Sequence, residues 1–352
     1  MQYPLLDLAP ITRHLRAVAS SRLLIAAVHH LPVFECLAKG PLSIEGLRHQ
    51  LGLQQRPAMV LFPALCAMGL LAFDSEHKLL ITPLGKYLLV SSSPNLTGYV
   101  GLEKNDAGVL EMVERLKNDG PLDVNIGLSY VKEGNTASPM DDPQSARFFT
   151  LALAGRAQYL SPLVAAKLPG KTHLLDVAGG TGYYSYEWLL ANPTARATVF
   201  DRTAVLEVAK ELLDSFSRSG RPGAQSVKAR VAFQPGDMLT DELPKTDLLL
   251  AASLFHDWPE STCRRLAKRF AEAIHPGGEL CVHDAFLNDS LDGPLAVTDY
   301  SAMLFLHTKG RAYSRKEYAA WLKEAGLEVK EQYVPTLMEY GLISASKAYT
   351  GE

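Results

Sequence analysis

The sequence HLLDVAGGTG at His173–Gly182 joins a short apolar run to three closely spaced glycines. The apolar part is typical of a parallel strand that is buried on both faces, and Asp176 stands near its carboxyl end. Glycines directly after a strand allow a tight turn in which the backbone can approach a ligand, because no Cβ stands in the way. We expect a helix over 183–191. Strand, glycine turn and helix in this order predict the nucleotide-binding crevice of a doubly wound sheet.

A second acid indicates what the crevice binds. Asp201 ends the next apolar stretch, 195–200, and follows the glycines by about 20 residues, where a carboxylate reaches the hydroxyls of a ribose. An NAD site prefers a third glycine where Ser185 stands. The pattern DxxGGxG instead suits a cofactor with an amino-acid tail and no pyrophosphate. NAD and S-adenosyl-L-methionine both fit the two acids, and the glycine pattern favours the second.

Length and composition fit two globular domains and argue against several partners. The chain has 352 residues, of which 47% are hydrophobic and 21% charged, and its net charge is −3. This charge gives no reason to expect nucleic acid or an anionic membrane as a partner. No apolar run is long enough to span a bilayer, and the N-terminus has no basic region typical of a signal peptide. The four cysteines are far apart in apolar surroundings, which does not predict a metal site. We expect a cytoplasmic protein without a bound metal.

The first hundred residues predict helices followed by a small hairpin. The expected elements are an apolar helix over 11–31, a short helix capped by Ser43, a second helix over 57–70, and hairpin strands at 71–73 and 79–81. This order is typical of a winged helix, which raises DNA binding as an alternative. The second helix carries almost none of the polar side chains that read bases, so it is expected to be a packing surface. The first helix is expected to be buried across a two-fold interface with a second copy of the chain.

The remaining sequence alternates helices and strands. Helices are expected over 148–168, 204–216, 259–274 and 314–325, the third ending at Pro276-Gly-Gly278, and strands over 230–233, 247–254, 279–287, 327–334 and 338–347. The strand at 247–254 is continuously apolar and therefore central. The sequence thus predicts an α/β fold, a doubly wound Rossmann-like sheet that ends in an antiparallel hairpin and follows a mostly helical domain.

Polar groups gather at the carboxyl ends of these strands, where ligands bind in such sheets. They are Asp176 with the glycines, Asp201, Asp237 in a GDM sequence, the run FHDW at 255–258, and His283 with Asp284. GDM, an apolar strand, HDW, PGG and a strand that ends in an acid resemble the S-adenosylmethionine-dependent O-methyltransferases. The resemblance is to the group that includes plant caffeate, hydroxyindole and bacterial small-molecule enzymes. It covers essentially the whole chain.

The resemblance implies a division into domains and a set of roles. The domains would be a winged-helix dimerisation domain at 1–100, a helical connector at 101–160 that contributes to the substrate pocket, and a methyltransferase domain at 161–352. His256 would be the general base and Asp284, one methylene shorter than the family's glutamate, would orient it. Residues implied to bind the cofactor are Ala178, Gly179, Gly180, Asp201, Asp237, Met238 and Ser253. Candidates for substrate binding, which core packing would equally explain, are Phe149, Leu153, Phe255, Tyr300 and Met303.

Besides Asp284, four positions depart from the family pattern. Ala178 replaces a glycine in a role that depends on the backbone, and Arg202-Thr203 replace a usual Leu-Pro. A second acid that flanks the base in the family is missing, and Ala312 stands near its place. We expect a homodimeric methyltransferase that acts on a hydroxyl of a small aromatic molecule. The alternatives are a relative that methylates nitrogen or carbon or runs non-methylating chemistry, and a winged-helix regulator that senses a small molecule. The apolar second helix and the intact HDW argue against the regulator.

Overall fold

The computed structural model describes residues 6–120 and 137–349. The chain forms two compact units, one made of residues 1–128 and 286–315 and the other of residues 129–285 and 316–352. The first is called the helical unit and the second the sheet unit. Within the described ranges, no helix is both long and apolar enough to cross a membrane.

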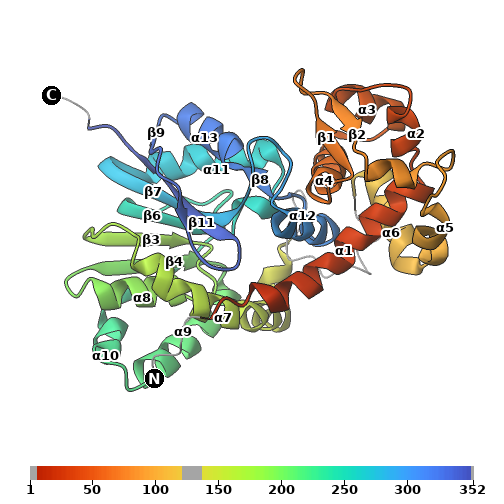
Figure 1. Ribbon diagram of the computed structural model, residues 1–352. Coiled ribbons are helices and arrows are strands. Elements are labelled where there is room, and N and C mark those ends of the chain that lie inside the picture. The colour runs from red at the N-terminus through yellow and green to blue at the C-terminus, as the bar shows by residue number, and fades with distance from the viewer. Residues whose placement is uncertain (1–5, 121–136, 350–352) are drawn as a thin grey trace. The chain divides into compact units, whose positions relative to one another are not determined.

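The sheet unit is built on a mostly parallel sheet (Figure 1). Its strands are β3 (His173–Val177), β4 (Arg196–Asp201), β5 (Val231–Pro235), β6 (Thr246–Ala252), β7 (Ile274–Leu287), β9 (Glu328–Val329), β10 (Val334–Pro335) and β11 (Tyr340–Ser346). Their order is β10-β11-β7-β6-β3-β4-β5, and β9 pairs with β11. Strands β3 to β7 pair in parallel, whereas β11 is antiparallel to β7 and β10 to β11. The central position predicted for 247–254 is confirmed, because β6 lies fourth of seven and Leu248, Leu249 and Leu250 are fully buried.

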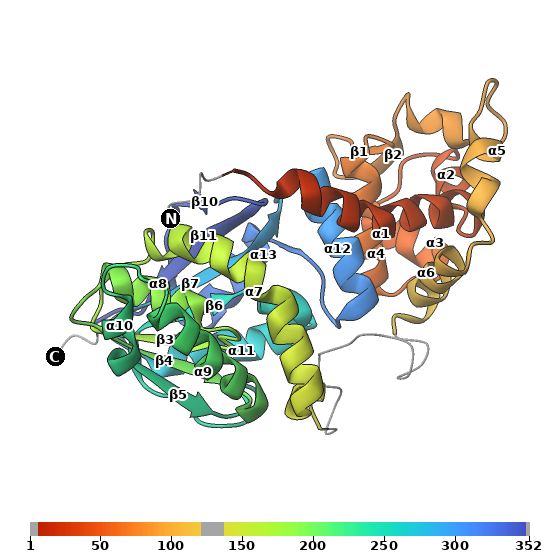
Figure 2. The same ribbon diagram turned by 90° about the horizontal axis from the view of Figure 1, so that it is seen from below.

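Helices cover both faces of this sheet. They are α7 (Pro143–Ala165), α8 (Tyr183–Ala191), α9 (Thr203–Ser217), α10 (Ala224–Val227), α11 (Glu260–Ala273) and α13 (Arg315–Glu324), with 3-10 turns η3 (Pro139–Asp141), η4 (Lys228–Arg230) and η5 (Phe255–Asp257). Helices α8 and α9 lie on one face, and α11 and α13 on the other (Figures 1 and 2). Parallel strands with helices on both faces confirm the predicted doubly wound α/β fold.

Two predicted boundaries in the sheet unit are wrong. Helix α11 ends at Ala273 and β7 begins at Ile274, so Pro276–Gly278 lie inside the strand and do not follow the helix. The reason is that the buried Ile274 already pairs with Thr246 before the glycines are reached. The single strand predicted over 327–334 is two short ones, β9 and β10, because polar residues at 330–333 interrupt the apolar pattern at the sheet edge.

The helical unit contains most of the N-terminal third of the chain. Its elements are α1 (Ala9–His29), α2 (Val33–Leu37), α3 (Ile44–Leu51), α4 (Gln55–Ala67), β1 (Leu71–Phe73), β2 (Leu79–Ile81), η1 (Gly85–Leu88), α5 (Thr97–Val100), η2 (Gly101–Glu103), α6 (Ala107–Asn118), α12 (Leu295–His307) and β8 (Tyr313–Ser314). The Ser43 side chain accepts a hydrogen bond from the Gly46 N–H at 3.0 Å, which confirms the predicted cap of α3. All residues of α4 from 57 to 66 are buried, so this helix is a packing surface as expected.

Helix α12 is absent from the sequence-based prediction. It lies beside α1 in both views (Figures 1 and 2), and ten of its thirteen residues are buried. A helix that is apolar on nearly all sides shows no periodic alternation of apolar and polar positions, so the sequence pattern gives no signal for it.

Candidate active site

A cleft in the sheet unit opens at the carboxyl ends of β3, β4, β5 and β6. It encloses about 1270 Å³ of empty space, including open solvent at its mouth. One wall is the turns after these strands, with Asp176, 178–181, 200–202, 236–239, 252–254, Asp257 and Trp258. The other is η3 and one face of α7, with Ser138, Met140, Phe149, Thr150, Leu153, Arg156 and Ala157. The predicted gathering of strand ends therefore forms a cavity.

The glycine turn brings its backbone close to the cleft. Ala178, Gly180 and Gly182 all have positive φ, at 53°, 54° and 76°. A Cβ added to Gly179 would lie 2.8 Å from a methyl of Val199, so a larger residue does not fit there. Ala178 holds a conformation that glycine adopts more readily, and its N–H donates to the carbonyl of Phe200 at 2.8 Å. The turn is thus fixed by the strand beside it.

Two buried acids, Asp201 and Asp176, lie beside this turn. The Asp201 carboxylate accepts hydrogen bonds from the backbone N–H of Gly180 at 2.8 Å and of Arg202 at 2.7 Å. Asp176 accepts a hydrogen bond from the Ser185 hydroxyl at 2.8 Å. Burial raises the pKa of Asp176 to about 7 and that of Asp201 to about 6. Ionising these two side chains is therefore costly, and a positively charged ligand in the cleft would offset the cost.

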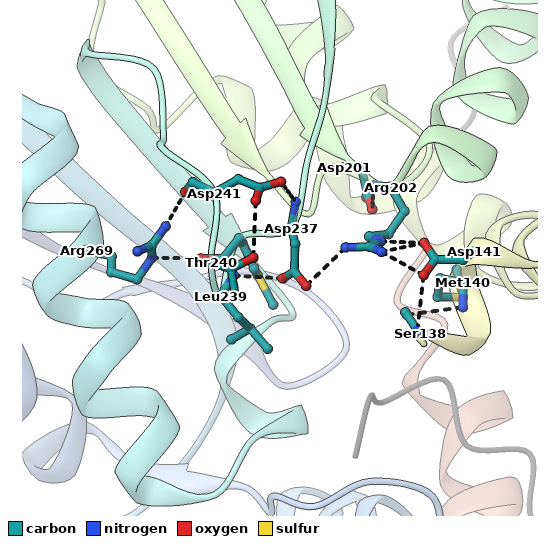
Figure 3. A network of polar contacts seen from close by, with 11 residues as sticks. Ser138, Met140, Asp141, Asp201, Arg202, Asp237, Leu239, Thr240, Asp241 and Arg269 are labelled. Atoms are coloured by element: carbon teal, nitrogen blue, oxygen red, sulfur yellow. Dashed lines mark hydrogen bonds and ion pairs between the residues drawn. The ribbon is translucent and has the colours of Figure 1, made fainter. Parts of the chain in front are cut away.

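Arg202 connects two acids at the edge of the cleft (Figure 3). Its Nε and Nη2 donate to the two carboxylate oxygens of Asp141 at 2.6 and 2.7 Å. Its Nη1 lies 3.1 Å from Oδ2 of Asp237, whose Oδ1 accepts from the Leu239 N–H at 2.9 Å. The GDM sequence predicts Asp237 as a site residue, whereas Asp141, which lies 61 residues before Arg202, carries no motif of its own and is not predicted.

His256 and Asp284, the predicted base and its partner, lie in contact. His256 is in η5, which follows β6, and Asp284 is on β7, the neighbouring strand. Nδ1 of His256 lies 2.5 Å from Oδ1 of Asp284, and the side chains are 2% and 0% exposed. The Tyr318 hydroxyl donates to the other oxygen of Asp284 at 2.8 Å. On the opposite side, Nε2 of His256 is 3.5 Å from Oδ1 of Asp257, which lines the cleft.

The charges of this group depend on one another. Burial alone would lower the pKa of His256, but the carboxylates of Asp284 and Asp257 outweigh it and the pKa is raised. Burial would raise the pKa of Asp284, but His256 and the hydrogen bonds from Tyr318 and the Ala285 N–H outweigh it and the pKa is lowered. Asp284 therefore stays ionised and holds a proton on Nδ1 of His256, which leaves Nε2 as the nitrogen that exchanges protons.

Arg156 brings a positive charge to the cleft from α7. Its Nη1 donates to the Tyr340 hydroxyl at 2.9 Å. The Tyr340 ring is stacked on His283 with ring centroids 5.3 Å apart, and burial lowers the pKa of His283 to about 3. This histidine is therefore neutral, and the sequence signal HD at 283–284 combines one packing residue with one site residue.

The other predicted residues fall into three places. Phe149, Leu153, Met238 and Ser253 line the cleft. Phe255 is fully buried and its ring packs against those of Phe270, Tyr318 and Trp321. Tyr300 and Met303 are on α12 of the helical unit, where the Arg16 guanidinium lies 4.3 Å from the centroid of the Tyr300 ring. Ala312, also in the helical unit, is fully buried, and its N–H donates to the Ser301 hydroxyl at 3.1 Å.

Comparisons with known proteins identify the family. Residues 127–328, more than half of the chain, match the family model described as an O-methyltransferase domain. A 3-hydroxy-5-methyl-1-naphthoate 3-O-methyltransferase of Streptomyces sahachiroi is 27% identical over 331 residues, which cover 90% of this chain and 89% of the relative.

Solved structures agree with this match. An O-methyltransferase family 2 protein from Planctomyces limnophilus, in complex with apigenin, is 36% identical with a TM-score of 0.87, covering 99% of this chain and 98% of that one. Human N-acetylserotonin methyltransferase in complex with SAM shares the fold at 23% identity with a TM-score of 0.54, covering 99% of this chain and 100% of that one. The chain therefore belongs to the S-adenosylmethionine-dependent O-methyltransferases, and S-adenosylmethionine is its cofactor.

Proposed function

We propose that the protein methylates a hydroxyl group of a small aromatic molecule and that His256 is the general base. The observation that carries this proposal is the buried contact of 2.5 Å between His256 and Asp284 at the end of the central strands. A hydroxyl must lose its proton as its oxygen attacks a methyl group, and a histidine is the side chain best suited to accept it near neutral pH.

We propose a role in cofactor binding for each residue around the glycine turn. The backbone of Ala178, Gly179 and Gly180 would hold its amino-acid end, since the turn leaves no room for a side chain at Gly179. Asp201 would accept from the ribose hydroxyls, and Asp237 with Met238 would contact the adenine. Ser253, which has a positive φ of 53° and lines the cleft, would lie beside them. When bound, S-adenosylmethionine supplies a methyl group on a positively charged sulfur, and the acids Asp176 and Asp201 suit that charge.

The chain's own residues would move one proton. Nε2 of His256 would accept the proton of the acceptor hydroxyl, and Asp284 would stabilise the resulting imidazolium through Nδ1. The bound cofactor would supply the methyl group and leave as the neutral thioether S-adenosylhomocysteine. Tyr318 holds Asp284 in place from its other oxygen. Oδ1 of Asp257 lies 3.5 Å from Nε2 of His256, so this carboxylate would help to orient the acceptor hydroxyl toward Nε2. Asp257 thus places an acid beside the base although none stands at Ala312.

The walls of the cleft suit a flat, largely apolar acceptor. Phe149, Leu153, Met140 and Trp258 supply apolar surface, and Arg156 adds a positive charge among them. The named relative acts on a hydroxynaphthoate, and the Planctomyces protein was solved with apigenin. We propose that the acceptor belongs to this hydroxylated aromatic class. The predicted pocket residues Phe255, Tyr300 and Met303 do not line this cleft.

The test is a screen of hydroxynaphthoates, simple phenols and flavones with labelled S-adenosylmethionine, followed by identification of the methylated atom. Methyl transfer to oxygen of at least one aromatic hydroxyl is the expected result. A product methylated only on nitrogen or carbon would replace the proposal with one of the alternatives.

We also propose that the protein is a homodimer that joins through its N-terminal winged-helix region, 1–100. Ile11, Leu15 and Val18 are 65%, 69% and 53% exposed, and they stand on one face of α1 at helical spacing. Such a stripe costs free energy in water, so burial against a second copy would stabilise it. We further propose 101–160 as the connector and 161–352 as the methyltransferase domain, although residues 286–315 of the latter belong to the helical unit.

A cytoplasmic location completes the proposal. Cys36, Cys66, Cys263 and Cys281 are all free thiols, and the last three are buried. Free thiols without disulfides suit a reducing compartment. Cell fractionation that finds the protein outside the cytoplasm would contradict this.

A further inference from the structure

We infer that Arg202 is a positioning residue that connects the loop after β5, on the proposed cofactor side of the cleft, to η3. The wall formed by η3 and α7 is called the acceptor wall. Arg202 joins Asp237, the proposed adenine-side acid, to Asp141 in η3, directly before α7. The inference rests on the proposed placement of the cofactor. It assigns a role to a position where the family usually has leucine.

The contact with Asp141 has the geometry of a strong ion pair. Two parallel N–H groups of Arg202 meet the two oxygens of Asp141 at 2.6 and 2.7 Å, so the guanidinium fixes both the position and the plane of the carboxylate. Arg202 is 26% exposed, Asp141 37% and Asp237 13%. Asp237 is the most shielded of the three, whereas the contact with Asp141 is open to solvent and its contribution rests on its two-point geometry.

Asp141 passes this constraint to the acceptor wall. Its Oδ2 also accepts from the Ser138 N–H at 3.1 Å, and the Ser138 hydroxyl accepts from the Met140 N–H at 3.2 Å, which closes η3 into a capping box. The next residue, Asp142, caps α7 by accepting from the Ser145 N–H at 2.8 Å. Positioning η3 therefore sets where Met140 and the first cleft-facing turns of α7 stand.

The other end of the bridge is equally well held. Asp237 N–H donates to Asp241 at 2.8 Å, and Arg269 donates from Nε to the carbonyl of Met238 at 2.9 Å (Figure 3). This loop therefore offers Arg202 a fixed carboxylate. Burial would lower the pKa of Arg202, but Asp141, Asp237 and Asp241 outweigh it and the pKa is raised. Removing the charge of Arg202 would leave these like charges facing one another. A cofactor that fixes Asp237 should in turn steady Arg202, Asp141 and η3.

The bridge predicts that ligand binding on one side protects the backbone on the other. Hydrogen exchange should be measured with and without S-adenosylhomocysteine on the full chain and on Arg202→Leu and Asp141→Asn. In the wild type we expect the ligand to protect both the glycine turn, 178–182, and the segment 138–146. In either variant, protection of the turn should remain while protection of 138–146 falls by about tenfold, the size of a moderate coupling between sites.

Three further results make the test decisive. Glu211→Gln is the matched control, because it removes the exposed ion pair of Arg147 with Glu211, which also joins α7 to α9 but lies outside the cleft. This control should keep wild-type protection of 138–146. Equal protection of 138–146 in wild type, Arg202→Leu and Asp141→Asn would overturn the inference. A wild type that shows no protection at 178–182 would overturn the placement of the cofactor itself, and with it the inference.

Discussion

His256, in the turn η5 that follows β6, and Asp284, on the neighbouring strand β7, are in contact with Nδ1 and Oδ1 2.5 Å apart, and both side chains are buried. A buried carboxylate that receives hydrogen bonds from Tyr318 and the Ala285 N–H is held in one position. The imidazole it contacts is held in one orientation as well. The arrangement resembles the acid and histidine of a hydrolytic triad in its logic, since the acid fixes the tautomer of the base.

Replacing His256 by alanine should lower turnover on the order of 10²–10⁴-fold, because the acceptor proton loses its base. Affinity for S-adenosylhomocysteine should change little, since His256 is not among the cleft-lining residues that would hold it. The acceptor used must have an ordinary phenol pKa of about 10, so that it is not already ionised. Wild-type turnover in this variant would remove His256 from the mechanism, and calorimetric titration supplies the control on binding.

The pH dependence of kcat/KM should show how the carboxylates around His256 change its pKa. Only neutral His256 accepts a proton, so kcat/KM should rise with pH through its pKa, which Asp284 and Asp257 raise against the effect of burial. In Asp284→Asn the raising charge is lost, so the rising limb should move to lower pH, and turnover should fall by less than in His256→Ala. Tyr318→Phe should move the limb less, because it removes only a hydrogen bond to Asp284. A limb that stays in place in Asp284→Asn would show that another group titrates.

Replacing Asp201 by alanine should weaken S-adenosylmethionine binding by about 10- to 100-fold, the range expected when a charged hydrogen-bond acceptor is lost. Two losses combine in this variant, because the ribose hydroxyls lose an acceptor and the Gly180 N–H loses its partner. Isothermal titration with S-adenosylmethionine and NAD is the measurement. NAD should give no heat with either protein, and comparable heats for NAD and S-adenosylmethionine would refute the assignment of the cleft.

Asp176 predicts an unusual dependence of stability on pH. Its pKa is about 7 in the folded protein and 3.8 as the ordinary value, so the folded state favours the protonated acid. The stability contribution is then fully present below pH 3.8 and is lost as the pH rises through about 7. Asp176→Asn, which can still accept from Ser185, should melt a few degrees above the wild type at pH 8 and without that advantage near pH 4. Equal melting temperatures at pH 8 would contradict the raised pKa.

The exposed stripe on α1 predicts the assembly. Leu15→Glu places a charge at the centre of the stripe and should convert a dimer into a monomer at micromolar concentration, as measured by sedimentation. Tyr349→Glu is the control and should leave the dimer intact, because it changes a large side chain near the other end of the chain that is 81% exposed, against 69% for Leu15. A wild-type chain that sediments as a monomer would exclude the interface.

The sequence predicted the parts of the protein whose signals are local. The strand, glycine turn and helix from His173 to Ala191 are adjacent in sequence, and each has its own pattern of apolar residues and glycines. The carboxyl ends of parallel strands meet at one edge by the geometry of the fold, so the contact of His256 with Asp284 could be expected from two separate motifs.

Contacts made by unremarkable residues could not be predicted in this way. Asp141 and Tyr318 belong to no motif, and they reach Arg202 and Asp284 only because η3 and α13 pack where they do. Phe255 illustrates the opposite case, since it stands beside His256 in a strong motif yet its ring packs against three other aromatic rings. Neighbouring positions on a short 3-10 turn point in different directions, and sequence order alone does not say which one faces the ligand.

The two acids beside the glycine turn, Asp176 and Asp201, can bind and release protons near neutral pH. With pKa values of about 7 for Asp176 and about 6 for Asp201, part of the population carries a proton there at neutral pH. A cation entering the cleft favours the ionised carboxylates and displaces that proton to the buffer, whereas an uncharged ligand does not. Binding of the positively charged cofactor is therefore coupled to proton release, and its measured heat includes the ionisation heat of the buffer.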